Sequence, residues 1–345
     1  MIVVVDNITY LLDTEKKNAT VTRSLEPYSG CVTIPDTIVC NAVEYMVADI
    51  LDEAFAGCTG LQTVVMGANV ESVGISAFEG CSMLSDVVFG VGLHVIGMEA
   101  FKGCTSLKNV SLPKDVIVVG KGAFAACEAL ETVTLSQNLI NIEPSLFDGC
   151  KSLSTVSIGP MVDSIGEYAF CGCSSLSNVQ FPDGLLNVEG WAFRDCISLK
   201  EIVLPATVVS VKKGAFWGCS SLVSFELPKG VNMLDQGVLA GCTALENVKL
   251  HSGVLNIGYG AFYNCSSLES ITVPAAVVGI GDQAFRSCTS LKVLNVMCEA
   301  APMCSNDIAD SGVYAKALLR VPKGLVGEYG FARIWDRFDN VEEIE

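Results

Sequence analysis

The hydrophobic positions of this chain recur with a period of 23 residues over most of its length. Each period carries the pattern A-F-x-G-C-x-x-L-x-x-V-x-L-P-x-x-V-x-x-I-G, in which a leucine always follows the cysteine by three residues. The cysteines of this series, called here the cysteine ladder, are Cys58, Cys81, Cys104, Cys127, Cys150, Cys173, Cys196, Cys219, Cys242, Cys265 and Cys288. A fixed period of this length is typical of a solenoid, in which each coil packs on its neighbours and one core runs along the stack.

Each repeat predicts one coil made of two short strands and a compact turn. The segment L-x-x-V-x-L ends in strict alternation, as at Val110 and Leu112, which predicts a short strand with one face inward. A proline follows in many copies and ends that strand. The next segment, V-x-x-I-G, predicts a second extended piece whose glycine permits a turn. The stretch A-F-x-G-C predicts a helical turn with glycine near its end.

Both ends of the chain depart from the repeat and predict caps, because the terminal coils of a solenoid would otherwise expose apolar core and unpaired strand edges. Residues 1–50 contain two hairpin-like pieces around "DN" and "EKKN" and a degenerate repeat, "VTIPDTI", with "VCNAVEYMV" inserted after it. Residues 51–296 form the predicted solenoid of about eleven 23-residue coils. In residues 297–345 the segment "LLRVPKGLVGEYGFARIWDRF" predicts a strand followed by an amphipathic helix.

The composition indicates an ordered chain and excludes several kinds of partner. Hydrophobic residues make up 50 % of the sequence and charged residues 17 %, which argues against disorder. The net charge of −17 argues against nucleic acid and anionic membrane as partners. No apolar run approaches the ~20 residues of a membrane span. The start, "MIVVVDNITYLLD", lacks the basic region of a signal peptide, so a cytoplasmic location and a removed leader both stay open.

The cysteine ladder admits three interpretations: free thiols, disulfides or a metal site. Neighbouring coils would place equivalent Cα atoms ~5 Å apart, which a disulfide allows, but equivalent side chains in a stack point the same way. Because cysteine is among the most buried residue types, we expect free thiols packed in the core. Zinc would need four converging ligands, and the closest pair is Cys171 and Cys173. Two further pairs remain disulfide candidates if the protein is exported: Cys31 with Cys40, and Cys298 with Cys304.

The sequence shows no catalytic constellation. The chain has two histidines, His94 and His251, which fall seven coils apart and cannot share a site. No Ser-His-Asp or Cys-His arrangement can then be assembled around them. The glycines of "GVGLHVIG" lack the spacing of a phosphate-binding loop. We therefore expect no enzyme, no cofactor and no metal ligands; an enzyme would need a deep pocket that gathers acids from several coils.

The pattern "IGEYAFCGCSSLSNVQFP" resembles the BspA-type leucine-rich repeats of bacterial surface proteins, over about residues 50–296. The flanks "YSGCVTIPDTI" and "LLRVPKGLVGEYGFARIWDRFDNVEEIE" are similar to the family's N-terminal and C-terminal segments. The resemblance implies a right-handed leucine-rich-repeat solenoid of the α/β class, β-dominated with short helical turns. It also implies an extracellular or cell-surface protein whose role is binding rather than catalysis, and it carries over no catalytic residues.

The first outward column that could bind a partner is aliphatic. It occupies the first variable position of V-x-x-I, where six of ten residues are aliphatic: Ile117, Ile140, Leu186, Val209, Leu255 and Val278. If this column faces solvent it forms an apolar stripe, which usually marks a partner surface. The alternatives are that the second strand is buried on both faces, or that scattered apolar residues are tolerated at the surface.

The second candidate is aromatic. Tyr168 and Trp191 occupy one column in adjacent coils, so their rings are expected to be neighbours, and Trp217 and Tyr263 share the column two before the cysteine. Exposed aromatic rows suit glycan or peptide contacts, since one end of the side chain is apolar and the other polar. Packing over the turns is the alternative.

These observations predict a non-catalytic binding or adhesion protein, monomeric or weakly self-associating, that presents an extended repeat surface to an extracellular protein or glycan. A different class is structural, in which coils or aliphatic stripes associate to build a surface layer. Repeat scaffolds serve many partners, so the fold alone does not name the ligand.

Overall fold

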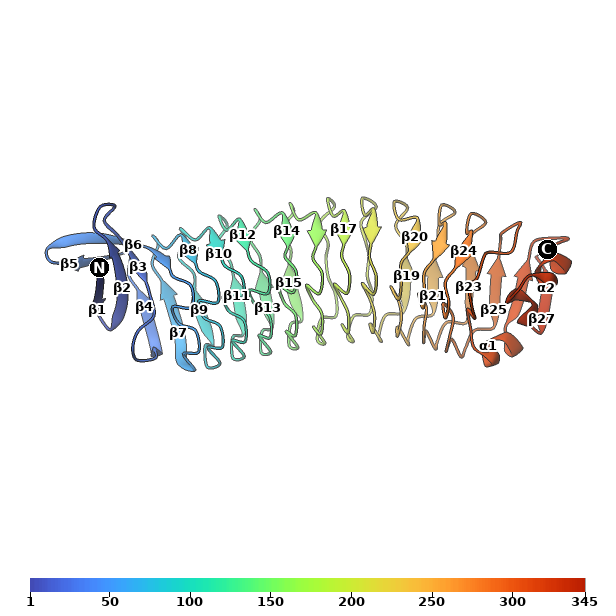
Figure 1. Ribbon diagram of the computed structural model, residues 1–345, viewed down its shortest axis with the longest axis horizontal. Helices are drawn as coiled ribbons and strands as arrows, with labels where there is room; N and C mark the ends of the chain where they lie inside the picture. Colours follow the sequence, from blue (N-terminus) through green and yellow to red (C-terminus); the bar gives the residue numbers. More distant parts are fainter. Residues whose placement is uncertain (345) are drawn as a thin grey trace. The chain divides into compact units, whose positions relative to one another are not determined.

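The chain folds as a leucine-rich-repeat solenoid of about 13 turns with few helices (Figure 1). The structure is a computed structural model that describes residues 1–344. The turns number more than the eleven predicted coils because β4 (Ser29–Ile34) and β26 (Leu318–Val321), outside the regular repeats, pair in parallel with repeat strands. Two compact units, residues 1–175 and 176–345, make up the chain. The division into two caps and a repeat region stays a prediction.

In the first unit the strands of successive coils pair in parallel, one repeat apart. The longer strands are β4, β7 (Gly60–Met66), β9 (Asp86–Val88), β11 (Asn109–Ser111), β13 (Thr132–Thr134) and β15 (Thr155–Ser157), which pair as β4-β7-β9 and β11-β13-β15. The short strands are β8 (Ser72–Val73), β10 (Val95–Ile96), β12 (Val118–Val119), β14 (Asn141–Ile142) and β16 (Ser164–Ile165). Of these, β8-β10-β12 and β14-β16 pair.

The second unit repeats this arrangement. Its longer strands are β19 (Ser224–Glu226), β21 (Asn247–Lys249), β23 (Ser270–Val273) and β25 (Val293–Val296), followed by β26 and β27 (Asn340–Glu343). Its short strands are β17 (Asn187–Val188), β18 (Ser210–Val211), β20 (Met233–Leu234), β22 (Asn256–Ile257) and β24 (Gly279–Ile280). The longer strands pair as β19-β21 and β23-β25-β26-β27, and the short ones as β17-β18 and β20-β22-β24.

The longer strands show the alternation that the sequence predicts. In β11 and β13 the central valines, Val110 and Val133, are buried and the residues on either side are exposed. Equivalent valines pair across the ladder, so each coil adds its inward side chain to the same layer. The period-2 pattern of the sequence is therefore sufficient to orient these strands.

The stretch A-F-x-G-C is a succession of tight turns rather than the helical turn that the sequence predicts. In the first complete repeat, the amide of Cys58 donates to the carbonyl of Phe55 at 3.0 Å, and Gly57 has a φ of +71°. Amides of these turns also bond to the next coil: Phe78 donates to Ala100 at 2.7 Å. The turn does not continue into a helix because several of its backbone amides donate hydrogen bonds to the next coil instead of to carbonyls of their own coil.

The glycine that ends V-x-x-I-G is needed for a different reason from the one expected. A Cβ at Gly97 would lie 2.7 Å from the backbone of Gly74 in the preceding coil, and one at Gly166 would lie 2.7 Å from the backbone of Pro144. Neither glycine has a left-handed φ. Close approach between coils, rather than an unusual turn, excludes a side chain at these positions.

Hairpins and helices stand at the two ends of the chain. β1 (Ile2–Val5), β2 (Ile8–Asp13) and β3 (Asn18–Val21) form an antiparallel meander, and β5 (Thr37–Cys40) forms a hairpin with β6 (Val43–Ile50). Near the C-terminus lie α1 (Ser311–Lys316), α2 (Val326–Phe331) and the 3₁₀ helix η1 (Trp335–Arg337). Tyr329 and Trp335 are buried there and donate to the carbonyls of Cys298 and Pro302, both at 2.9 Å.

Stacked phenylalanines run through the core of both units. Phe124 is fully buried, and its ring lies 5.3 Å from that of Phe101 and 6.0 Å from that of Phe147, with interplanar angles of 6° and 12°. In the second unit Phe262 and Phe285 stack at 5.5 Å. Rings of this column thus pack against the same residue of adjacent coils, except where Leu239 replaces phenylalanine.

We predict that Phe124→Ala lowers the free energy of unfolding by about 3–5 kcal/mol, because it leaves a cavity between two stacked rings. Equilibrium urea unfolding measures the change. Phe331→Ala is the matched control, since the side chain of Phe331 is 93 % exposed and its loss should cost less than about 0.5 kcal/mol. Similar losses in the two variants would contradict this account of the core.

Candidate functional site

The aliphatic column of the sequence is exposed in the first unit. Ile117 and Ile140 are 55 % and 54 % exposed, and each lies directly before a short strand, β12 or β14. The amide of Ile117 donates to the carbonyl of His94 at 2.9 Å, and that of Asp163 donates to Ile140 at 2.9 Å. These bonds join equivalent positions one coil apart, so the side chains stand in a row.

The same column is exposed in the second unit. The exposed fractions of its aliphatic residues are 39 % for Leu186, 56 % for Val209, 41 % for Leu255 and 56 % for Val278. Val209 donates to Leu186, and Val278 to Leu255, at 2.9 Å. Met303, which is 76 % exposed, extends the row by one coil because its amide donates to Val278 at 2.9 Å. Burial of the second strand on both faces is therefore ruled out.

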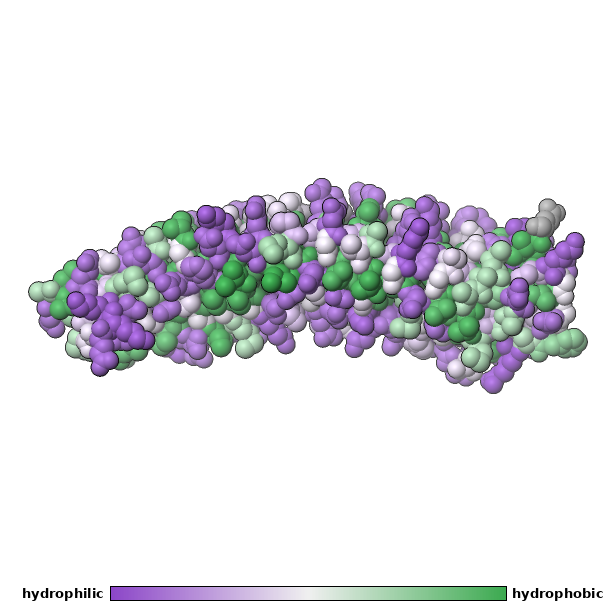
Figure 2. Space-filling model, turned by 90° about the horizontal axis from the view of Figure 1, so that it is seen from above, coloured by the Kyte–Doolittle hydropathy of each residue, from purple (hydrophilic) through white to green (hydrophobic). Residues whose placement is uncertain are grey.

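We call these rows the apolar lane, defined by Ile117 and Ile140 in the first unit and by Leu186, Val209, Leu255 and Val278 in the second. Val118 and Met233, next to it in sequence, are also exposed. Seen from above the view of Figure 1, strongly hydrophobic side chains gather over the stretch from β10 to β14, among hydrophilic ones (Figure 2). The binding role of the lane stays a prediction.

The outward face of the longer strands is different in character. It carries small polar side chains such as Thr132, Thr134 and Ser157 in the first unit. In the second unit exposed ion pairs span adjacent coils, as between Lys249 and Glu226 at 3.3 Å. Exposed pairs of this kind contribute little, typically about 0–1 kcal/mol. This face is therefore more polar than the aliphatic column, although Val88 and Asp86 of β9 are also exposed on it.

A cavity of about 540 Å³ opens beside this face in the second unit, lined by Ile202, Leu204, Phe225 and Leu227 among others. It lies where residues 200–205 form no strand, so the parallel pairing of the longer strands starts only at β19. Its lining holds a few charged groups but no histidine or cysteine. The cavity has apolar walls without an acid or base arranged for catalysis.

The aromatic residues occupy the turns. Trp191 and Trp217 lie in adjacent coils of the second unit, with ring centroids 5.7 Å apart and an interplanar angle of 56°. The guanidinium carbon of Arg194 lies 5.5 Å from the centre of the Trp191 ring. Tyr263 is half-buried in a later coil. Tyr168 belongs to the first unit and Trp191 to the second, so the expected contact between their rings stays a prediction.

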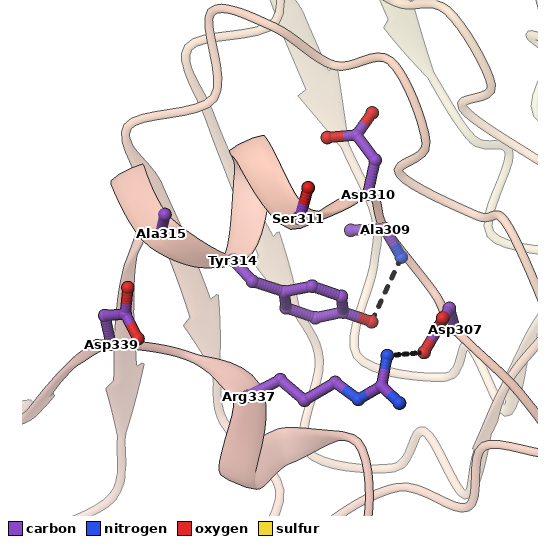
Figure 3. Close-up of a pocket in the computed structure, with 8 residues that line it drawn as sticks. All are labelled: Asp307, Ala309, Asp310, Ser311, Tyr314, Ala315, Arg337 and Asp339. Atoms are coloured by element: carbon purple, nitrogen blue, oxygen red, sulfur yellow. Dashed lines mark hydrogen bonds and ion pairs between the residues drawn. The ribbon is translucent and has the colours of Figure 1, made fainter.

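A pocket of about 480 Å³ lies near the C-terminus, and several of the side chains that line it contact one another (Figure 3). Arg337 pairs with Asp307 and lies over the ring of Tyr314, whose hydroxyl accepts from the amides of Ile308 and Ala309 at 3.1 and 3.2 Å. Burial raises the pKa of Tyr314 above its usual value. The contacts among Arg337, Asp307 and Tyr314 therefore hold the C-terminal segment together.

Every cysteine of the ladder is buried, as the sequence predicts, and within residues 1–344 neither the ladder nor the cap pairs form disulfides. Nine ladder thiols donate to a carbonyl of the preceding coil: Cys104 donates to Phe78 and Cys127 to Phe101, for example, both at 3.2 Å. Burial raises the pKa of Cys127 and of Cys288 to about 12. The cysteine is therefore a packing residue whose thiol bonds to the turn of the preceding coil.

The remaining chemistry of the chain is sparse. Within residues 1–344 no group of three or more His, Cys, Asp and Glu side chains could hold a metal ion. His251 has a structural role: its Nδ1 accepts from the amide of Gly253 at 3.1 Å, which leaves Nε2 to donate to Val231 at 2.8 Å. No helix in the described part of the chain is long and apolar enough to span a membrane.

The fold and the repeat pattern define a leucine-rich-repeat protein. The sequence profile of the BspA type leucine rich repeat region matches residues 48–177 and 163–292, more than half of the chain. The chain therefore belongs to the BspA-type leucine-rich repeat family, as its sequence predicts.

Solved bacterial structures share the fold. The chain is similar to a leucine-rich repeat protein from Bacteroides ovatus, with 27 % identity, a TM-score of 0.66 and coverage of 99 % of this chain and 100 % of that one. It is also similar to a leucine rich cell surface protein from Faecalibacterium prausnitzii, with 23 % identity, a TM-score of 0.60 and coverage of 100 % and 95 %. The pneumococcal vaccine antigen PcpA has 16 % identity, a TM-score of 0.52 and coverage of 100 % and 99 %. None of the curated proteins matches the chain.

We predict that iodoacetamide at pH 8 modifies Cys31, which is exposed, and leaves the cysteine ladder unmodified in the folded protein. The thiolate is the reactive form, and the raised pKa of buried thiols such as Cys127 keeps them protonated at that pH. Peptide mass spectrometry of the labelled protein reads the sites. Labelling in denaturant is the control and should reach all 16 cysteines; modification of Cys127 without denaturant would contradict the prediction.

Proposed function

We propose that this protein is a non-catalytic binding protein of the bacterial cell surface that contacts an extracellular protein through the apolar lane. The exposure of the lane carries this proposal: aliphatic side chains that would lose contact with water on binding stand at one column in three pairs of adjacent coils, separated by Asp163 and Asn232. An exposed apolar row on an otherwise polar surface is typical of a partner surface.

The lane suits binding because its backbone is fixed before a partner arrives. The amides of Ile117, Val209 and Val278 each bond to the equivalent residue of the preceding coil, so each of the three is held ~4.8 Å from that residue along the stack. Little backbone freedom remains to be lost on association, and preorganised surfaces bind more tightly for that reason. Burial of each aliphatic side chain adds up to about 1.5–3 kcal/mol.

Family membership and relatives support the location and the absence of catalysis. BspA-type repeats are non-enzymatic scaffolds, and structures of this fold include a cell surface protein and a vaccine antigen. A repeat scaffold that varies its outward columns meets the requirements of adhesion without any active site.

We predict that the double variant Val209→Thr/Val278→Thr binds its protein partner at least about tenfold more weakly, because threonine keeps the shape of valine but exposes a hydroxyl to the interface. Surface plasmon resonance over a panel of immobilised extracellular-matrix proteins measures the change.

The matched control for this experiment is Val203→Thr/Val223→Thr. It makes the same chemical change at two exposed valines of the second unit that lie outside the lane. Circular dichroism should show the same fold for both double variants, since all four side chains are exposed. Equal affinity of the two double variants would contradict a role for the lane.

A structural function is the second candidate, and the same exposed lane supports it. Two copies that cover each other's lanes would bury the apolar rows, and repetition of such contacts would build a surface layer. Sedimentation velocity separates the two functions. The binding proposal predicts a monomer whose sedimentation coefficient is independent of concentration, apart from weak self-association at the highest concentrations. A large increase with concentration in the wild type, lost in Val209→Thr/Val278→Thr, would favour the structural function.

A further inference from the structure

The coil that contains residues 191–196 carries a bulky and a charged side chain at two strained backbone positions. The residue five before each ladder cysteine has a left-handed φ in every coil, and four of these residues are glycines: Gly122, Gly214, Gly237 and Gly260. Trp191 occupies this position with a φ of +61°. A bulky residue is an outlier in this region, where a Cβ costs about 1–2 kcal/mol.

The second strained position immediately precedes the cysteine. Seven coils have glycine there, again with positive φ, whereas this coil has Asp195 with a φ of +59°. Two large or charged side chains thus stand, four residues apart, at positions with a left-handed φ; of the other ten coils, four have glycine at the first position and seven at the second. Strain of this kind is concentrated at functional sites, because a stability cost without a function would be lost.

The next coil makes room for both side chains. A Cβ at Gly214 would overlap the ring of Trp191, and a Cβ at Gly218 would overlap the carboxylate of Asp195. Trp217 rests in the same way on the following coil, since a Cβ at Gly237 would lie 2.7 Å from its ring. The two indoles are therefore seated on glycine backbone rather than inserted into the core.

Two charged side chains, Arg194 and Asp195, lie beside the indole pair. Asp195 binds Nε of Arg194 at 3.2 Å and so orients the guanidinium group beside the Trp191 ring. The two terminal nitrogens of Arg194 make no hydrogen bond among residues 1–344. They remain available to a ligand that contacts the ring.

A second cation, Lys213, lies close to the backbone of Gly190 and Trp191. Lys213 is exposed, its amide carbonyl accepts from Trp191 at 3.0 Å, and its methylene chain passes within 3.4 Å of the place where a Cβ of Gly190 would stand. In the part of the chain that the structure describes, Lys213 forms no ion pair. Two available cations beside an aromatic pair are unusual in a chain with a net charge of −17.

We propose that Trp191, Trp217, Arg194 and Lys213 form a binding site for a carboxylated sugar ring of an acidic glycan. The apolar face of a pyranose packs on an indole, as amphipathic aromatic side chains allow. The carboxylate of the sugar accepts hydrogen bonds from the two terminal nitrogens of Arg194, because planar guanidinium groups bind carboxylates through two parallel hydrogen bonds. Lys213 adds a second charge, and the carboxylate of Asp195 accepts a sugar hydroxyl.

An acidic peptide fits this surface less well than a sugar. Peptides are usually bound along an unpaired strand edge or in a groove. Here the backbone is already paired, since the amide of Asp195 donates to the carbonyl of Trp217 at 2.7 Å. A nucleic acid would require many clustered cations, and this site has two.

The experiment measures binding of D-glucuronic acid and N-acetylneuraminic acid to the full chain by saturation-transfer NMR and by quenching of tryptophan fluorescence. D-Glucose and N-acetylglucosamine are the neutral probes. We expect both acids to bind at least about tenfold more tightly than the neutral sugars. Equal binding of acidic and neutral sugars, or binding of none of the four, would overturn the proposal.

Two variants and one matched control locate the site. Trp191→Gly installs the residue that four other coils have, so it should fold with an unchanged or higher melting temperature while losing sugar binding. Arg194→Gln should remove the preference for acids. Arg286→Gln changes the same column of a distant coil and should change nothing. Retained acid binding in Trp191→Gly, or equal losses in Arg194→Gln and Arg286→Gln, would contradict the assignment.

Two further measurements separate this inference from its rivals. The sugar-site inference shares with the proposed function only the assumption of a non-catalytic binding role. The variant Val209→Thr/Val278→Thr should therefore bind the sugars as the wild type does. Loss of sugar binding in that variant would place the site on the apolar lane and overturn the inference. Binding of a poly-glutamate peptide in preference to both acidic sugars would favour a peptide ligand instead.

Discussion

Backbone hydrogen bonds between corresponding segments of adjacent coils are the interaction on which the rest of this structure depends. They join the longer strands, the short strands and the turns, as where Phe101 donates to Ala123 at 2.8 Å. Such a ladder requires every coil to have the same length and nearly the same backbone. The constraint explains the constant 23-residue period, because one inserted residue would displace every later side chain from its column.

The ladder also explains the residues that recur inside each coil. The carbonyl of Phe101 accepts the amide of Cys104 at 3.2 Å within its own coil and the thiol of Cys127 at 3.2 Å from the next. A cysteine is small enough to fit beneath the stacked rings and can still donate this bond, whereas an alanine would leave the second lone pair unused. The ladder of thiols is therefore a consequence of packing, and neither redox chemistry nor metal binding is needed to explain it.

Function can vary only at positions that the ladder leaves free. The apolar lane and the indole pair lie on different outward columns, and both consist of side chains that a uniform repeat would not contain. At Trp191 and Asp195 the repeat backbone even disfavours the side chain that is present, since φ is positive at both. Membership of the BspA-type family accounts for the scaffold but not for these departures, because one repeat scaffold serves many partners.

The sequence by itself determined the period, the inward columns and the buried thiols, since a strict spacing of apolar residues can be satisfied only by stacked, equivalent coils. It also pointed to the aliphatic column and to Trp191 and Trp217, but not to Arg194, Asp195 or Lys213, although Asp195 stands visibly in a glycine column. Only the tertiary structure decided that the lane faces solvent, that A-F-x-G-C is a set of turns, and that Gly97 is required by the coil before it. The physical reason is that these features depend on contacts between residues one repeat apart, where backbone groups compete for partners that a local pattern does not reveal.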